Sequence, residues 1–424
     1  MMSDELAYDL LVVGLGYVGL PLAREALRAG LRVCGYDTNP RVALRLNAGA
    51  SHVDGVSDDD VVEMLAAGFH AGGEGEAVRA ADVMVLCVPT PLTADGVPDL
   101  TSVVTAARLA ARRLRPGMLV VLESTTYPGT TDDVVRPILE ESGLVAGEDF
   151  ALAFAPERID PGNAEFGIGN TPRIVGGHTP GCTRRALDFY GAFVKEVVPA
   201  KGTREAEMAK ILENTYRQVN IALVNELAMV SHSLGVDVWD VIACARTKPF
   251  GFASFMPGPG VGGHCIPVDP LYLSYKAREL GVTTRMIDLA QQINDGMPEY
   301  VVQRAAALLA GANGDLARAD VLLLGVTYKA DVADRRESPA DDVVRQLRSR
   351  GAAVRYHDPF VDSWSVDGRV VDRVDGLEAA LRAADVTILL QWHAQYRAQF
   401  DENAPRLLFD TRGRLGGRPG VAVL

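Results

Sequence analysis

A short apolar strand followed by a glycine-rich turn constrains the fold of this chain most. Residues Asp9 to Val13 form the apolar run, and the turn Gly14-Leu15-Gly16-Tyr17-Val18-Gly19 follows at once. A helix-like segment continues through Ala29, and the next strand, Arg32 to Tyr36, ends at Asp37. Strand, glycine turn, helix, strand and acidic residue in this order form the dinucleotide-binding fingerprint. The pattern predicts a doubly wound α/β domain with a bound dinucleotide.

The three glycines of the turn have separate expected roles. Gly14 permits the tight turn, Gly16 lets a pyrophosphate approach the helix N-terminus, and Gly19 allows close packing of helix on sheet. Tyr17 and Val18 complete the predicted cofactor-binding turn. The alternative is a structural glycine turn in an α/β domain without a ligand.

Asp37 is expected to accept hydrogen bonds from the adenosine ribose hydroxyls. A carboxylate at that position repels a 2′-phosphate, so NAD is favoured over NADP. Arg41 lies four residues further along and leaves NADP open as an alternative.

Further strands are expected between helix-like stretches, which predicts a parallel sheet. They are Val83 to Val88, Met118 to Leu122, Phe150 to Phe154 and Arg173 to Val175. Ligands of doubly wound sheets bind beyond the carboxyl ends of the strands. The residues found there, and therefore expected near a cofactor or substrate, are Pro89, Thr90, Thr125, Glu157 and Arg158.

A long helix is predicted from about Arg204 to Leu234, with apolar residues around most of its circumference. Such a helix is largely buried, and it predicts a dimer built on it. Four polar residues fall close to one stripe: Lys210, Asn214, Arg217 and Asn225. Because buried polar groups need partners, this stripe is expected to face a site or a subunit interface.

A second glycine-rich segment, Pro257 to Pro270, contains Cys265 and, four residues later, Asp269. Its glycines can expose backbone N–H groups to an anionic ligand, and the cysteine lies where the loop enters a predicted helix. This combination indicates a nucleophile in a backbone cradle. A zinc site at His264 is a weaker interpretation, since the usual spacing of further ligands is missing.

A second α/β unit is predicted to begin near Asp320. Its expected strands are Val321 to Gly325, Ala353 to Tyr356, Val386 to Leu390 and Leu407 to Phe409, with a helix at Pro339 to Arg350. It resembles the first unit without the glycine fingerprint. Lys329, Arg336 and Arg412 are expected to grip a second nucleotide-sized ligand, although each could also be a solvated surface charge.

Composition narrows the class of partner. The 424 residues carry a formal net charge of −13, which argues against nucleic acid or an anionic membrane surface. The five cysteines are scattered, and neither a signal peptide nor a membrane-spanning run is expected. We therefore expect a cytoplasmic protein.

The motifs together resemble the UDP-glucose/GDP-mannose dehydrogenase family over essentially the whole chain. The matching segments are the turn at 14–19, Glu123-Ser124-Thr125-Thr126-Tyr127-Pro128-Gly129-Thr130, Pro156-Glu157-Arg158-Ile159-Asp160-Pro161-Gly162, Lys210-Ile211-Leu212-Glu213-Asn214-Thr215, Gly262-Gly263-His264-Cys265 and Arg336-Glu337-Ser338-Pro339. The segments around Lys248 to Phe252, Glu157 to Asn163 and Gly263 to Pro270 look most like the UDP-N-acetylglucosamine 6-dehydrogenase branch, whose close relative oxidises UDP-N-acetylmannosamine. Trp392-His393 and Thr411-Arg412-Gly413 depart from the usual family residues.

The resemblance implies two Rossmann-like doubly wound domains joined by a long central helix. Residues 1–200 would form the NAD-binding domain, 201–312 a helical dimerisation domain with the cysteine loop, and 313–424 the UDP-sugar-binding domain. It implies oxidation of a sugar C6 alcohol to a carboxylate by two NAD in succession, of the kind used in polysaccharide biosynthesis. UDP-N-acetylglucosamine is the expected substrate, with UDP-glucose and UDP-N-acetylmannosamine as alternatives.

The catalytic residues implied by the resemblance are Cys265, Lys210, Asn214, Asp269, Glu157 and Thr125. Cys265 would add to the aldehyde so that a second oxidation gives a thioester, and Lys210 with Asn214 would stabilise the oxyanion and hold a water. Asp269 would orient Lys210 or that water, and Glu157 is a candidate acid or base. Substrate contacts are implied for Glu157, Arg158, Lys210, Asn214, Phe255, Gly258, Gly260, Gly262, Lys329 and Arg412, and a cofactor contact for Arg336.

Two other classes are compatible with parts of the pattern. A two-electron hydroxyacid dehydrogenase of similar architecture would use Lys210 and Asn214 but has no use for Cys265. A non-catalytic NAD-binding protein would need none of the reactive residue types. Lys210, Asn214 and Glu157 could each be structural if taken alone.

Overall fold

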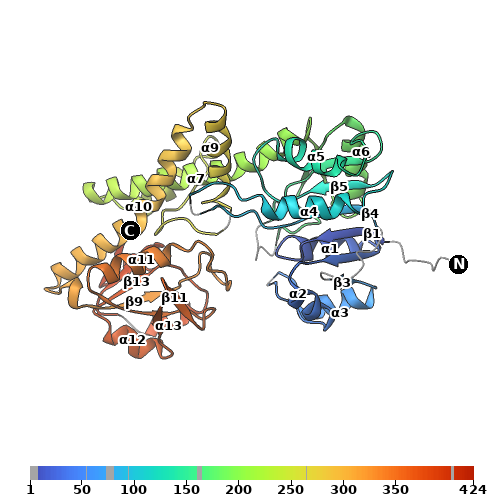
Figure 1. Cartoon of the computed structure of the whole chain (residues 1–424). Helices are drawn as coiled ribbons and strands as arrows, with labels where there is room; N and C mark the ends of the chain where they lie inside the picture. The colour runs from blue at the N-terminus through green and yellow to red at the C-terminus, as the bar shows by residue number, and fades with distance from the viewer. Residues whose placement is uncertain are drawn as a thin grey trace. The chain divides into compact units, whose positions relative to one another are not determined.

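The computed structural model describes residues 8–53, 55–72, 81–93, 95–159, 165–263, 265–402 and 405–424. The chain divides into two compact units, drawn in Figure 1. The first comprises residues 1–213 and 271–282, and the second comprises residues 214–270 and 283–424. Each unit is built around its own sheet.

The first unit contains a sheet with eight described strands in the order β3-β2-β1-β4-β5-β6-β7-β8. This order has the crossover between β1 and β4 that creates the dinucleotide-binding crevice of doubly wound folds. The strands are β1 (Tyr8–Val13), β2 (Val33–Tyr36), β3 (His70–Gly72), β4 (Ala81–Leu86), β5 (Leu119–Leu122), β6 (Ala151–Phe154), β7 (Arg173–Gly177) and β8 (Val197–Pro199). β7 runs antiparallel to β6, whereas the other neighbouring strands pair in parallel.

Both faces of this sheet are covered, which explains why its strands are apolar throughout. Leucines and valines of one face pack with α1 (Gly19–Arg28), α3 (Asp58–Ala66) and α6 (Pro180–Tyr190). The other face packs with α4 (Thr101–Ala111) and α5 (Arg136–Glu140). The remaining elements here are α2 (Pro40–Asn47) and the π-helical turn η1 (Thr130–Val135).

The central segment is dominated by α7 (Thr203–Leu234), which is 32 residues long and agrees closely with its predicted range. It is followed by α8 (Val238–Ala245), α9 (Asp269–Glu279) and α10 (Arg285–Gly311). No helix in the part of the chain that the structure describes is long and apolar enough to cross a bilayer.

The N-terminal part of α7 is tied to the N-terminus of η1 by a buried carboxylate. Glu207 accepts hydrogen bonds from the backbone N–H of Gly129 at 2.6 Å and from the N–H and hydroxyl of Thr131 at 2.8 and 2.7 Å. These donors are the ones that a helix start leaves unsatisfied. Burial nevertheless raises the pKa of Glu207 to about 7.

The prediction that α7 is largely buried is correct for one face of the helix and wrong for the other. One face is buried, but the other leaves an apolar stripe exposed, which we call the α7 stripe. It consists of Met208, Leu212, Tyr216, Leu223, Leu227, Val230 and Leu234, spaced three, four or seven residues apart. Residues at these intervals share one side of a helix, so the stripe is continuous.

The second unit contains a sheet with seven described strands in the order β11-β12-β10-β9-β13-β14-β15. They are β9 (Asp320–Leu324), β10 (Ala353–His357), β11 (Trp364–Val366), β12 (Arg369–Arg373), β13 (Val386–Leu389), β14 (Leu408–Asp410) and β15 (Val421–Val423). The helices are η2 (Leu316–Arg318), α11 (Pro339–Ser349), α12 (Leu377–Ala383) and α13 (Tyr396–Glu402). β12, β10, β9, β13, β14 and β15 run in parallel, and β11 is antiparallel at the edge.

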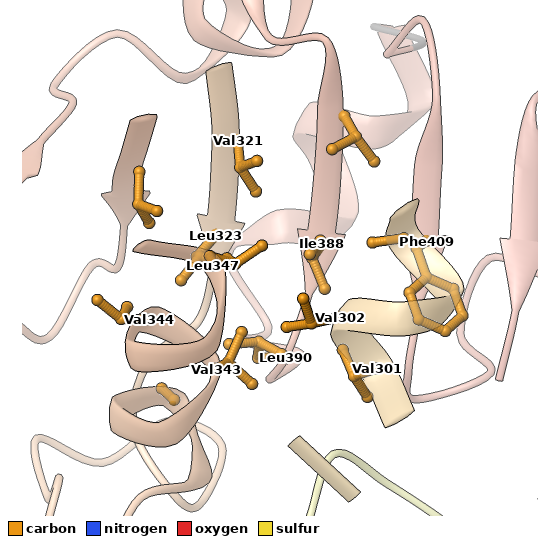
Figure 2. Packing of buried hydrophobic residues seen from close by; sticks show 14 of the residues in the cluster. Val301, Val302, Val321, Leu323, Val343, Val344, Leu347, Ile388, Leu390 and Phe409 are labelled. Carbon is orange, nitrogen blue, oxygen red and sulfur yellow. The ribbon is translucent and has the colours of Figure 1, made fainter. Parts of the chain in front are cut away.

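Helices cover both faces of this second sheet as well. Figure 2 shows Val301 and Val302 of α10 and Val343, Val344 and Leu347 of α11 packed against side chains of β9, β13 and β14. The opposite face packs with α12 and α13. The prediction of two Rossmann-like doubly wound domains with a long central helix is therefore confirmed.

Candidate active site

The glycine turn after β1 has the geometry that a dinucleotide requires. Gly14 has φ +93°, and a Cβ there would lie 2.3 Å from the carbonyl oxygen of Cys87. A Cβ on Gly19 would lie 1.9 Å from the carbonyl oxygen of Gly14, so only glycine permits this close packing. Around Gly16, by contrast, nothing lies within 4 Å of the added Cβ. The first and third glycines serve the fold, and the second leaves space beside the start of α1.

The start of α1 has no side-chain cap. The N-cap residue Val18 makes no side-chain capping hydrogen bond, and Tyr17 is exposed beside it. Uncapped N–H groups at a helix N-terminus bind phosphate through hydrogen bonds and the helix dipole. The residues of the turn thus fit the pyrophosphate of NAD.

Asp37 follows β2 and is held by its surroundings. One carboxylate oxygen accepts the N–H of Leu15 at 3.0 Å, and the other accepts the N–H of Asn39 at 2.8 Å. Each oxygen has a further lone pair, and the residue is half-buried, so the carboxylate can still accept from ribose hydroxyls. Arg41 is exposed in the first turn of α2.

The other cofactor-site candidates of the first unit follow β4 and β5. Thr90 is buried, and its carbonyl oxygen accepts the hydroxyl of Tyr272 from α9. Pro89 is exposed next to it, and Thr125 is half-buried after β5. Parallel strands bring these loops to the same edge of the sheet as Gly14 and Asp37.

Lys210 is buried on α7 and is anchored to the loop after β6. Its Nζ donates to the carbonyl oxygen of Glu157 at 2.6 Å. The side chain of Glu157 points elsewhere, because its Oε1 accepts the N–H groups of Arg158 and Ile159 at 2.6 and 2.7 Å. Arg158 pairs with Glu213 at 2.7 Å. The backbone of Glu157, more than its carboxylate, fixes the amine of Lys210.

A buried arginine that the sequence analysis did not single out organises this region. Arg173 lies between two carboxylates: it bonds to Glu123 and donates to Oε2 of Glu157 at 2.7 Å. Burial opposes the charge of Arg173, but Glu123 and Glu157 outweigh that effect and raise its pKa. Burial raises the pKa of Glu123, which also accepts the hydroxyl of Tyr190. We call these residues, Glu123, Arg173 and Glu157, the carboxylate–arginine triad.

The cysteine loop brings Cys265, Asp269 and Asn214 together in the second unit. Asp269 is buried and accepts the side-chain amide of Asn214 at 2.5 Å. Its backbone N–H donates to the carbonyl oxygen of Cys265 at 2.9 Å, and the cysteine itself is exposed. Asn214 lies one helical turn after Lys210 on α7. His264, considered above as a zinc ligand, lies outside the described residues.

The predicted polar stripe of α7 is correct for three of its members and wrong for one. Lys210, Asn214 and Asn225 are buried, but Arg217 is exposed. Gln218 is buried in its place and donates to Gln291 of α10 at 2.7 Å. Around the helix axis, residue 218 is rotated by about 40° from Asn214 and residue 217 by about 60° to the other side.

The glycines of the loop 257–263 allow it to pack tightly within the second unit. The N–H of Gly258 donates to Asn225 at 2.9 Å, and a Cβ there would lie 2.9 Å from the guanidinium of Arg412. A Cβ on Gly262 would lie 2.7 Å from Tyr328, and Gly260 has φ +134°. This loop therefore lies against the segments that carry Lys329 and Arg412.

The aromatic residues of this loop divide into two groups. Phe255 is half-buried, with its ring 5.6 Å from that of Tyr216. Phe250 and Phe252 are exposed and do not belong to the core of the second unit.

The cationic candidates of the second sheet have different environments. Arg412 follows β14, and its Nε donates to the carbonyl oxygen of Leu390 at 2.6 Å. Burial lowers the pKa of Arg412 to about 10, so it stays protonated at neutral pH. Arg336 is exposed and forms a forked pair with Asp334 at 2.6 to 3.1 Å. Lys329 is half-buried in the loop after β9.

Comparison with known proteins agrees with this arrangement. Three family models match in order: the NAD binding domain of the UDP-glucose/GDP-mannose dehydrogenase family at residues 8–194, its central domain at 204–296 and its UDP binding domain at 322–416.

Among curated relatives, UDP-N-acetyl-D-mannosamine dehydrogenase of Pyrococcus horikoshii is 36% identical over 91% of this chain and 90% of that protein. UDP-N-acetyl-D-glucosamine 6-dehydrogenase of Pseudomonas aeruginosa is 37% identical over 83% of each chain. Among solved structures, the UDP-D-ManNAc dehydrogenase of P. horikoshii matches with a TM-score of 0.88 over 98% of both chains at 33% identity. A UDP-glucose dehydrogenase of Pyrobaculum islandicum matches with a TM-score of 0.83 over 97% of this chain and 96% of that one, at 30% identity. With its sheets, its glycine turn and its cysteine loop all accounted for, the chain belongs to the UDP-glucose/GDP-mannose dehydrogenase family and is an NAD-dependent nucleotide-sugar dehydrogenase.

Proposed function

We propose that this chain oxidises the C6 hydroxyl of a UDP-2-acetamido sugar to the carboxylate. The observation that carries the proposal is the exposed Cys265 at the entrance to α9, with Asp269 paired to Asn214 one turn from Lys210. Relatives named for UDP-N-acetyl-D-mannosamine and UDP-N-acetyl-D-glucosamine support an acetamido group at C2. UDP-N-acetylglucosamine, expected from the loop sequences, and UDP-N-acetylmannosamine are the two substrates to compare.

Cys265 explains how one site can oxidise twice. An alcohol carbon can lose a hydride, but an aldehyde resists this until a nucleophile makes its carbon tetrahedral. The Cys265 thiolate adds to the aldehyde carbon, which forms a C–S bond and puts the carbonyl electrons on oxygen. Oxidation of this thiohemiacetal leaves a thioester. Water then attacks the thioester and the C–S bond breaks. The sulfur leaves as the thiolate, the sugar is released as the carboxylate, and the water and the new acid give up two protons.

The neighbouring residues hold the reacting groups. Lys210 donates to the oxygen that becomes negative when Cys265 adds, and Asn214 with Asp269 holds the hydrolytic water. Glu157 positions Lys210 through its carbonyl oxygen, and Thr125 supplies a hydroxyl at the end of β5.

NAD supplies the hydride acceptor for each of the two oxidations when it is bound. Gly14, Gly16, Gly19 and Asp37 would hold its adenosine and pyrophosphate. The nucleotide of the sugar would be held in the second unit by the loop 257–263 with Phe255 and by Lys329 and Arg412. Arg336 would contact the cofactor only after release from Asp334.

Product analysis tests the proposal. The purified protein is incubated with NAD and, separately, with UDP-N-acetylglucosamine, UDP-N-acetylmannosamine and UDP-glucose, and NADH and product mass are measured. We expect two NADH per sugar and a uronic acid from an acetamido sugar. One NADH per turnover would indicate a two-electron dehydrogenase, and tight nucleotide binding without turnover would indicate a non-catalytic protein. Absence of uronic acid from every UDP-sugar would refute the proposal.

The nucleophile has a matched control in the same unit. Cys265→Ala should abolish acid formation, whereas Cys244→Ala, which alters another exposed cysteine on α8, should leave it unchanged. Full acid formation by Cys265→Ala would exclude the thioester route.

We also propose that two copies associate through the α7 stripe. Seven large apolar side chains lie exposed on one helix face and repeat with helical spacing along most of α7. Contiguous exposed apolar surface of this kind often marks a protein–protein contact. In this arrangement residues 1–200 serve NAD, residues 201–312 serve dimerisation and catalysis, and residues 313–424 serve the UDP-sugar.

A further inference from the structure

The two sheets share a backbone arrangement that reaches beyond strand order. Gly325 follows β9 as Gly14 follows β1, with φ +70° and +93°. The N–H of Gly14 donates to the carbonyl oxygen of Tyr36 at 2.8 Å, and that of Gly325 donates to the carbonyl oxygen of His357 at 3.0 Å. An added Cβ on Gly325 would lie 2.2 Å from the carbonyl oxygen of Gln391, much as one on Gly14 meets Cys87. The second sheet thus has the same positive-φ glycine, with the same backbone contacts, with which the dinucleotide-binding turn of the first sheet begins.

The acidic residue of the fingerprint is retained as well. Asp358 follows β10 as Asp37 follows β2. It accepts the N–H of Val326, the residue after Gly325, at 2.6 Å and the N–H of Phe360 at 2.8 Å. Asp37 accepts the N–H of the residue after Gly14 and the N–H two residues beyond itself in the same way. The two carboxylates occupy equivalent places in their sheets.

Only the second carboxylate is closed off from a ligand. Asp358 is fully buried, and Nε2 of His393 lies 3.1 Å from its Oδ2. His393 is also fully buried, between the rings of Phe360 and Tyr396 at 5.0 and 5.5 Å. The imidazole therefore takes the place that a ribose would need, and this turn does not bind a second dinucleotide.

The other ring nitrogen of His393 holds the loop that carries Lys329. Nδ1 accepts the backbone N–H of Asp331 at 3.0 Å, so this nitrogen carries no proton and Nε2–H donates to Asp358. The same loop is fixed at Tyr328, whose carbonyl oxygen accepts the side-chain amide of Gln391 at 2.9 Å. The hydroxyl of Thr327 donates to the carbonyl oxygen of Lys329 at 2.8 Å.

We propose that His393 is a positioning residue for nucleotide binding: it fills the closed ribose place of the second sheet and, through Asp331, holds the loop that presents Lys329. The inference rests on the proposed function, in which Lys329 contacts the UDP portion of the substrate. The two hydrogen bonds of the His393 ring have separable effects. The bond to Asp358 stabilises the fold, and the bond to Asp331 sets the loop.

Two substitutions separate these bonds. In His393→Asn the amide oxygen can replace Nδ1 and accept from Asp331, but the partner of Asp358 is lost. In His393→Gln the amide nitrogen can replace Nε2 and donate to Asp358, but Asp331 loses its acceptor. Binding of UDP and of NAD is measured by calorimetry on the full chain, together with the thermal unfolding midpoint.

The variant that loses more UDP affinity should be the one that loses less thermal stability. We expect His393→Gln to bind UDP about tenfold more weakly with little loss of stability, and His393→Asn to keep UDP affinity within about threefold while unfolding at a lower temperature. NAD affinity should stay unchanged in both. UDP affinity that follows stability, or that is unchanged in His393→Gln, would overturn the assignment. Failure of the wild-type chain to bind UDP would instead contradict the proposed function.

Discussion

Arg173, which was not predicted as a site residue, is a buried cation that pairs with two carboxylates of the first unit. It is buried with Glu123 and Glu157, and removing the cation would leave both carboxylates without their partner. Arg173→Met should lower the free energy of unfolding by about 3–5 kcal/mol, since a buried charge without a partner costs that much. The measurement is denaturant unfolding followed by a signal from the first unit.

An exposed arginine in the same unit provides the comparison. Arg115 pairs with Asp82, and both side chains are about half exposed. Arg115→Met should cost less than about 1 kcal/mol, because solvent screens such a pair. Equal effects of the two substitutions would show that the triad does not stabilise the fold. Arg173→Lys keeps the positive charge but loses the planar guanidinium that can donate to both carboxylates. Its loss of unfolding free energy should lie between those of the two Met variants.

The triad also shows why the sequence predicted only part of the site. Glu157 and Lys210 lie in motifs and could be named, but the partners of Arg173 are 50 and 16 residues away in sequence. No local spacing marks such a contact, and β7 runs antiparallel, which the strand pattern did not indicate. The fingerprint glycines and Asp37 were predictable because their roles are set by local backbone geometry. The positions of Cys265 relative to Asp269 were predictable for the same reason.

At the scale of elements, the glycine turn after β1 contains one glycine that the fold requires and another that NAD binding is expected to require. Gly14→Ala should destabilise the first unit strongly, because φ is +93° and the new Cβ would overlap the carbonyl oxygen of Cys87. Gly16→Ala should leave the unfolding midpoint nearly unchanged and weaken NAD binding, since the added methyl occupies the space left for the pyrophosphate. Thermal unfolding and NAD titration distinguish the two. Normal NAD affinity in Gly16→Ala would exclude the expected placement of the cofactor.

The contact between α7 and η1 should respond to pH through Glu207. Burial raises its pKa from 4.5 to about 7, so the folded chain binds a proton that the unfolded chain releases in this interval. The stabilisation is therefore complete below about pH 4.5 and is lost as pH rises through 7, by about 3 kcal/mol. The difference in unfolding free energy between wild type and Glu207→Gln, measured from pH 4 to 9, should change by this amount. Glu205→Gln, an exposed neighbour on α7, is the control and should show no such change.

Helical periodicity predicted α7 better than it predicted its environment. The range and the burial of Lys210, Asn214 and Asn225 follow from spacing, but spacing alone assigned Arg217 to the wrong face. Apolar residues around the whole circumference predicted burial, and the single chain buries only one side. Within one chain a sequence cannot distinguish a face buried by its own fold from one that a second copy would cover.

At the scale of the whole molecule, the α7 stripe predicts a dimer that one charge should disrupt. Leu227 is 43% exposed near the middle of the stripe. Leu227→Asp should give a monomer in light scattering at micromolar concentration, because a carboxylate would be buried in the apolar contact. Val370→Asp alters an exposed valine on β12, outside the stripe, and should leave the dimer intact. A monomeric wild-type chain would contradict the interface.

The boundary between the two compact units falls inside α7, between Glu213 and Asn214, and so lies between two of the proposed catalytic residues. A continuous helix sets the spacing of Lys210 and Asn214 at about 6 Å, whatever the two units do. An inserted residue between them would rotate everything downstream by about 100° and move it by about 1.5 Å along the axis. When domains are exchanged between relatives of this chain, the rotation of one part of α7 relative to the other must therefore be preserved. A chimera joined within α7 should be active only when the number of residues from Lys210 to Asn214 is kept.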